Sequence, residues 1–169
     1  MAGKTTFTAE EWSRLLSSPM IAGIAITAAE PSGVWGLLKE GMAGGWALLE
    51  ARQSSQANPL VRAVADDFAT SEGRSAAKAA LQARFSGKTF NDLKTTALSE
   101  LRAVSSVLDG KAPEDSIAFK TWLQEVAKKA AEAGTEGGFL GFGGVAVSEA
   151  EKSTLAEIAV ALGRQSASA

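Results

Sequence analysis

Residues 89–108 read TFNDLKTTALSELRAVSSVL, and this stretch decides the fold class. Its apolar residues recur at steps of 3, 4, 4, 3 and 4, namely Phe90, Leu93, Ala97, Leu101, Val104 and Leu108. Such steps place the side chains on one face of an α-helix, because the helix has about 3.6 residues per turn. Gly110 follows and is predicted to end the helix. The stretch therefore predicts a long amphipathic helix with one buried face.

The rest of the chain carries the same pattern between helix-start signals. Thr8 with Glu11, and Ser148 with Glu151, have the spacing of capping boxes. Prolines in a first helical turn and glycines after a last turn mark further boundaries. The predicted helices cover residues 8–18, 18–29, 34–52, 58–68, 71–85, 89–108, 113–134 and 148–162, with Gly87, Gly134 and Gly163 as further stops. Because about a fifth of the residues are Ala and period-2 runs are scarce, we expect an all-α fold, a single compact bundle of seven or eight helices.

Two of these helices have wide apolar faces that include tryptophan. Residues 34–52 have a stripe of Trp35, Leu38, Met42, Trp46 and Leu49, with Leu37 and Leu48 off it. This wide apolar arc predicts a central position in the bundle. Residues 113–134 place Phe119, Trp122, Leu123, Val126 and Ala130 inside, and Glu125 is predicted to pair with Lys129 one turn away on the outer face.

The chain reads as one domain over residues 1–163, followed by a frayed tail over 164–169 that has nothing to bury. Residues 26–33 and 129–134 each end an Ala-rich helix in an acid and then a glycine. A domain with pseudo-twofold symmetry would show such an internal repeat. Chance similarity between Ala-rich helices explains it equally well.

Composition excludes several classes of function. The chain has no Cys, no His and no Tyr, so the usual thiol nucleophile and neutral-pH proton shuttle are missing, and enzymatic activity is disfavoured, with no catalytic residue predicted. Seventeen Lys and Arg against 19 Asp and Glu give a net charge of −2 with no basic cluster, which disfavours nucleic-acid binding. No apolar run approaches the roughly 20 residues of a membrane span, and no secretory signal is evident. The predicted compartment is the cytoplasm.

Two glycine-rich segments stand out. Interior glycines cost a helix about 0.5–1 kcal/mol each relative to Ala, so those of residues 33–52 require a compensating role. One alternative is close packing against another helix. The other is room for an apolar ligand, held by Trp35, Met42, Gly45 and Trp46 with Phe139 and Phe142 of the loop 134–147. The loop itself is expected either to plug the core with its aromatic residues or to cradle an anion.

Carboxylates are the remaining candidates for metal or acid–base chemistry. Glu30 and Glu40 flank the start of the glycine-rich helix, Glu132 and Glu136 flank the start of the glycine-rich loop, and Glu149 with Glu151 opens the last helix. Oxygen-only ligation by such residues would suit Mg²⁺ or Ca²⁺. The pairs Asp66-Asp67 and Glu114-Asp115 are expected on helix surfaces. No cofactor is predicted beyond such a divalent cation.

The C-terminal part of the chain resembles the TerB-like, tellurite-resistance-associated helical family. Glu136-Gly137 would correspond to the acid and glycine that end a helix, Val147 to an apolar turn residue, and Ser148 with Glu151 to the cap of the following helix. The family pattern has Asp where this chain has Glu136, and its loop is shorter. The resemblance, which lies mainly in residues 130–163, implies an all-helical, stress-associated cytoplasmic domain with an acidic, metal-binding site near Glu30 and Glu136.

The sequence thus predicts a domain that acts by binding a protein partner or a divalent ion, with self-association as one form of partnership. The alternative is a carrier of a small apolar ligand, held between the glycine-rich helix 33–52 and the loop 134–147.

Overall fold

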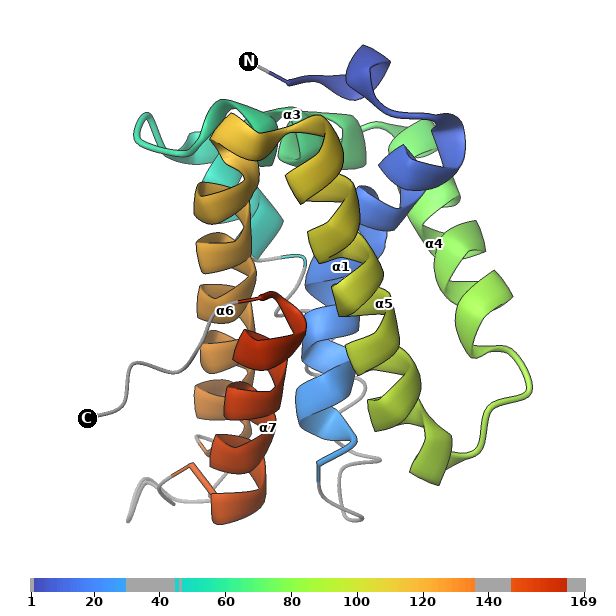
Figure 1. Cartoon of the computed structure of the whole chain (residues 1–169), viewed down its shortest axis with the longest axis vertical. Helices are drawn as coiled ribbons and strands as arrows, with labels where there is room; N and C mark the ends of the chain where they lie inside the picture. Colours follow the sequence, from blue (N-terminus) through green and yellow to red (C-terminus); the bar gives the residue numbers. More distant parts are fainter. Residues whose placement is uncertain (1, 30–44, 46, 136–146, 164–169) are drawn as a thin grey trace.

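The computed structural model describes residues 2–29, 45, 47–135 and 147–163, and every regular element in these ranges is helical. The elements are η1 (Lys4–Thr6), α1 (Ala9–Thr27), α3 (Pro59–Phe68), α4 (Ser71–Phe85), α5 (Phe90–Lys111), α6 (Pro113–Thr135) and α7 (Glu149–Ala161) (Figure 1). Residues 47–53 are also helical. The all-α prediction is confirmed.

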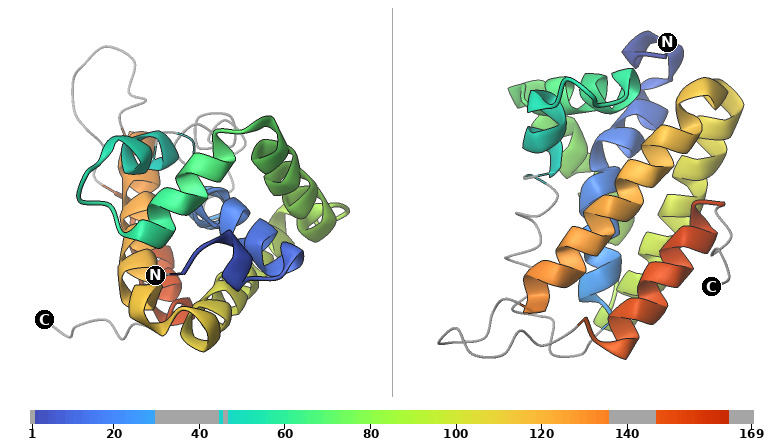
Figure 2. Two further views of the ribbon diagram at one scale, coloured as in Figure 1. Left: turned by 90° about the horizontal axis from the view of Figure 1, so that it is seen from above. Right: turned by 90° about the vertical axis from the view of Figure 1, so that its left-hand side faces the viewer.

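The N-terminal helix α1 lies at the centre of this arrangement. It packs against each of α3, α4, α5, α6 and α7, and the view from above in Figure 2 shows other helices around it. α3 lies across the end of the bundle at which α5 turns into α6 (Figure 1). The core side chains of α1 include Leu15, Leu16, Ile21, Ala22 and Ile26. The central place predicted for residues 34–52 therefore belongs, among the described elements, to α1.

Pro19 lies inside α1, so the predicted break into two helices at Ser18-Pro19 is wrong. A proline has no N–H, and its ring normally disrupts the hydrogen bond to the carbonyl four residues earlier. That carbonyl belongs to Leu15, and the Ser18 hydroxyl donates to it at 2.7 Å in a buried position. Because a side chain replaces the missing backbone donor, the helix continues to Thr27.

Most helix ends lie where the local sequence signals predict them. Both capping boxes form: Thr8 Oγ1 accepts from the Glu11 amide at 3.2 Å, and Ser148 Oγ accepts from the Glu151 amide at 3.2 Å. Gly87 and Gly163 adopt positive φ values of 73° and 72°. Gly110 does not, because α5 continues through it to Lys111, and α6 likewise runs past Gly134 to Thr135.

The predicted buried faces of α5 and α6 are confirmed at their centres, where Ala97, Leu101, Val104, Leu108, Phe119, Leu123, Val126 and Ala130 are all buried. The face of residues 47–53 is rotated from the prediction. Leu48 is 2% exposed and Leu49 is 42% exposed, whereas the sequence stripe placed Leu49 inward. Residues 47–53 lie against α3 and α6, and these neighbours decide which side of the helical turns is buried.

Two acidic residues predicted on helix surfaces instead form hydrogen bonds to other parts of the chain. The buried Asp115 carboxylate accepts from the Asn58 side-chain amide at 2.9 Å and from the Ala2 backbone amide at 3.0 Å. Asp67 accepts from the Trp12 indole N–H at 2.6 Å and forms an ion pair with Lys4. These carboxylates hold the N-terminal residues on the end of the bundle formed by α3 and the start of α6.

Within the described ranges, we find no helix whose length and apolar character would let it cross a bilayer. Residues 164–169, predicted to fray, and residues 30–33, which belong to the internal repeat, lie outside those ranges.

Candidate ligand-binding site

Most of the residues that the sequence nominated for binding lie outside the described part of the chain. These are Trp35, Met42, Trp46, Phe139 and Phe142 for a ligand, and Glu30 and Glu136 for a metal. Gly45 is described. It is helical and partly exposed, and no atom of the described residues lies within 4 Å of the place that a Cβ would occupy. At this glycine, the close helix approach that its composition suggested is not found.

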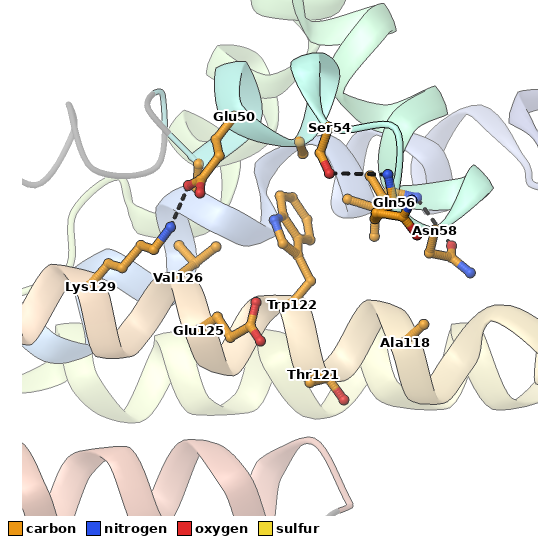
Figure 3. A pocket seen from close by; sticks show the side chains of 14 residues that line it. Glu50, Ser54, Gln56, Asn58, Ala118, Thr121, Trp122, Glu125, Val126 and Lys129 are labelled. Carbon is orange, nitrogen blue, oxygen red and sulfur yellow. Dashed lines mark hydrogen bonds and ion pairs between the residues drawn. The ribbon is translucent and has the colours of Figure 1, made fainter.

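A different site is present, between residues 47–58 and α6. It is an open pocket of about 420 Å³. One wall comes from the helical residues 47–53 and the turn that follows them, and the other from the middle of α6, with Trp122 between the two (Figure 3). The pocket is lined by Ala47, Glu50, Ala51, Ser54, Gln56, Ala57, Asn58, Val61, Ala118, Thr121, Trp122, Glu125, Val126 and Lys129.

The turn over residues 54–58 is held in place by hydrogen bonds to two helices. Asn58 caps α3 by accepting from the Leu60 amide at 2.9 Å, and its side-chain amide donates to Asp115 of α6. The Arg62 guanidinium of α3 donates to the Ser54 carbonyl. Because each end of the turn has a side-chain anchor, the upper wall of the pocket is preorganised relative to α6.

Trp122 is the largest side chain in the pocket. The fully buried Phe119 packs against it from the core, with ring centroids 5.2 Å apart and planes at 76°. The indole nitrogen lies on the side of the pocket where Glu50 and Lys129 lie (Figure 3). No described residue accepts a hydrogen bond from this N–H. Trp122 therefore offers the pocket an aromatic surface and a donor that no residue in the described part of the chain engages.

Three charged side chains surround the indole. Lys129 forms an ion pair with Glu50, which lies 79 residues earlier in the chain. The pairing predicted between Lys129 and Glu125 is therefore wrong, and Glu125 has no ion-pair partner among the described residues. The two carboxylates and one ammonium leave the pocket with a net charge of −1.

The groups with shifted pKa values lie elsewhere. Hydrogen bonds from the Lys120 ammonium and the Ser116 hydroxyl lower the pKa of Asp109, and the hydroxyl and amide of Thr89 lower that of Asp92. The Lys111 ammonium and the Thr8 amide lower the pKa of Glu11. These carboxylates form caps and ion pairs that stabilise helix ends, and none of them lines the pocket.

Metal chemistry finds no support in the described residues, since nowhere among them do three His, Cys, Asp or Glu side chains come close enough to hold one ion. The pocket contains two carboxylates, and one of these is already paired. Its apolar walls and aromatic centre are typical of a site for an organic ligand.

Sequence reasoning missed this site for an identifiable reason. Trp122 was read as a core residue because it follows Phe119 at helical spacing, yet it lies at the edge of the buried arc and is only partly buried. The opposite wall is a turn whose position depends on Asn58 and Arg62. The available signal was the placement of Glu125 one turn from Trp122, which puts a carboxylate beside an aromatic side chain.

Comparison with known proteins gives no match: no family model, no curated protein and no solved structure is similar to the chain. The TerB-like resemblance stays a prediction, and so does the functional reading that it implies.

Proposed function

We propose that this protein acts by binding a small, largely apolar organic ligand in the pocket between residues 47–58 and α6. This keeps the small-ligand reading of the sequence but moves the site, because α6 supplies the wall that the loop 134–147 was expected to supply. The observation that carries the proposal is the open pocket of about 420 Å³ around Trp122.

Its size and lining suit this role. Ligand pockets in proteins span roughly 300–1,000 Å³ and combine apolar walls with a few polar groups. Here Val61, Val126 and several alanines supply apolar surface, while the Trp122 N–H and the Glu125 carboxylate supply polar groups that have no partner among the described residues. The anchored turn over residues 54–58 lowers the entropic cost of ligand binding.

The test uses three probes with the same six-carbon chain and different head groups: hexan-1-ol, hexylammonium and hexanoate. Binding is followed on the full chain by the indole N–H resonances of a ¹⁵N-labelled sample, in which Trp122→Phe identifies the Trp122 signal. We expect at least one probe to shift that signal in a saturable way. A Trp122 signal that responds to none of the three would refute the proposed function.

A blocking variant shows whether the probe binds in the pocket. Ala118 is exposed on α6 and lines the pocket, so Ala118→Phe fills it without disturbing the core. Excluding about two methylenes of the probe should weaken binding about tenfold. Ala79→Phe, at an exposed position of α4 outside the pocket, is the matched control and should leave the affinity unchanged. Equal weakening by both variants would place the binding elsewhere.

A further inference from the structure

The charges in the Trp122 pocket restrict the chemistry of its ligand. Among the described residues of the lining, Lys129 is the only cationic one, and Glu50 neutralises it. Glu125 remains as an exposed carboxylate at the pocket edge with no ion-pair partner among the described residues. An anionic ligand would meet net repulsion here, while a cationic one would meet an available counter-ion.

Trp122 favours the same charge. A cation over the face of an indole is attracted by the negative potential of the ring within about 6 Å of its centroid. Trp122 and Glu125 are three residues apart on α6 and thus neighbours on the helix surface, and both side chains line the pocket (Figure 3). Phe119 covers Trp122 from the core side, so a ligand approaches from the pocket.

From this arrangement we infer that the ligand of the pocket is a small organic amine, bound as its ammonium ion between the Trp122 ring and the Glu125 carboxylate. The inference rests on the proposed function. A metal ion does not fit the same charges, because a single free carboxylate beside an aromatic ring provides too few oxygen ligands. The apolar walls formed by Val61, Val126 and the alanines would take up the carbon skeleton of the amine.

The volume of the site distinguishes a free amine from the lysine side chain of a partner protein. A pocket of about 420 Å³ has room for a whole small molecule. A peptide lysine would bring its polar backbone amides to the rim, where the Asn58 side chain already donates to Asp115 and accepts from the Leu60 amide. We therefore commit to the free amine.

The same three probes test the inference at pH 7, where hexylammonium is cationic, hexan-1-ol is neutral and hexanoate is anionic. We expect hexylammonium to bind about fivefold more tightly than hexan-1-ol, and hexanoate to bind most weakly. Glu125→Gln keeps the shape of the side chain and removes its charge, so the preference for hexylammonium over hexan-1-ol should fall below about twofold. Glu114→Gln, an exposed position of α6 outside the pocket, is the control and should keep the full preference.

A substitution of Lys129 tests the inference through an expected gain in affinity. Lys129→Ala releases Glu50 from its ion pair and should tighten hexylammonium binding about twofold, with no gain for hexan-1-ol. Lys128→Ala, on the neighbouring exposed position, should change neither affinity.

Each other outcome has a defined meaning. If hexan-1-ol binds as tightly as hexylammonium, or if Glu125→Gln keeps the preference, the amine inference is overturned while the proposed function stands. Tightest binding of hexanoate likewise overturns the inference. Tighter binding of Nα-acetyl-lysine methylamide than of hexylammonium would overturn the choice of a free amine. If no probe shifts the Trp122 signal, the proposed function itself fails.

Discussion

The Ser18 hydroxyl donates a 2.7 Å hydrogen bond to the carbonyl of Leu15, the oxygen that Pro19 leaves without its helical donor. Both groups are buried in the helix at the centre of the bundle, where an unpaired carbonyl has no access to water. A single hydroxyl therefore allows α1 to run unbroken across a proline.

We predict that Ser18→Ala lowers the free energy of unfolding by about 1–2 kcal/mol, because it leaves the buried Leu15 carbonyl unpaired. In a Pro19→Ala background the backbone amide of residue 19 can donate to that carbonyl, so the cost of Ser18→Ala should be smaller by about 1 kcal/mol. Urea denaturation of the four proteins of this cycle measures the coupling. Ser106→Ala, which removes a 3.1 Å bond to the Arg102 carbonyl at an exposed site, is the control and should cost little. A zero coupling energy would contradict the role assigned to Ser18.

The second prediction concerns the tight corner between α3 and α4. A Cβ on Gly73 would lie 2.0 Å from the carbonyl oxygen of Asp67, a backbone atom that cannot move independently. Gly73→Ala should therefore destabilise the protein by about 1–3 kcal/mol, although Ala is normally the better helix former. Thermal unfolding checks the sign. Glu72→Ala, on the preceding exposed position, should shift the melting temperature little, and a stabilising Gly73→Ala would show that the corner is looser than described.

The third prediction compares the substitution of Ala for Gly110 and for Gly87, where the expected changes in stability have opposite signs. Gly110 lies inside α5 with open space around its Cβ position, so Gly110→Ala should stabilise the protein by about 0.5 kcal/mol. Gly87 has equally open surroundings but a φ of 73°, so Gly87→Ala should cost about 1 kcal/mol. Chemical denaturation of the two variants is the measurement. Equal effects would mean that Gly110 ends the helix as its sequence position first suggested.

The fourth prediction is a pH dependence centred on Asp109 and Lys120. The Lys120 side chain is 8% exposed, and its ammonium group lies 2.7 Å from the Asp109 carboxylate. This hydrogen bond lowers the pKa of Asp109 below the ordinary value of 3.8. A lowered pKa in the folded state stabilises the protein above the ordinary value, and this stabilisation is lost as the pH falls through the folded-state pKa. Asp109→Ala should cost about 1 kcal/mol at pH 7, a small value because the Asp109 side chain is 59% exposed.

The cost of Asp109→Ala should decline below about pH 4, as the wild-type carboxylate takes up its proton. Stability measured by urea denaturation between pH 7 and pH 2.5 gives this profile. Adding Lys120→Met removes the ammonium left without a partner and should recover part of the loss. A cost that stays constant over the whole range would show that the ion pair does not contribute.

The local features of this protein follow from its amino-acid sequence. The capping boxes at Thr8 and Ser148 and the left-handed stops at Gly87 and Gly163 depend on atoms within a few residues of each other, so spacing alone predicts them. The buried stripes of α5 and α6 follow from the 3.6-residue period for the same reason. The helix break predicted at Pro19 is wrong because the Ser18 hydroxyl replaces the missing backbone donor. The general expectation that proline ends a helix does not include this possibility.

The candidate site was decided by tertiary structure alone. Its walls come from residues 47–58 and α6, and the ion pair between Glu50 and Lys129 joins positions that are distant in the chain. Sequence spacing paired Lys129 with Glu125, since neighbours on one helix are the only contacts that periodicity reveals. The turn at Asn58 places residues 47–53 over α6. This placement decides that Lys129 pairs with Glu50 and not with Glu125. The charge and shape of the pocket follow from that placement.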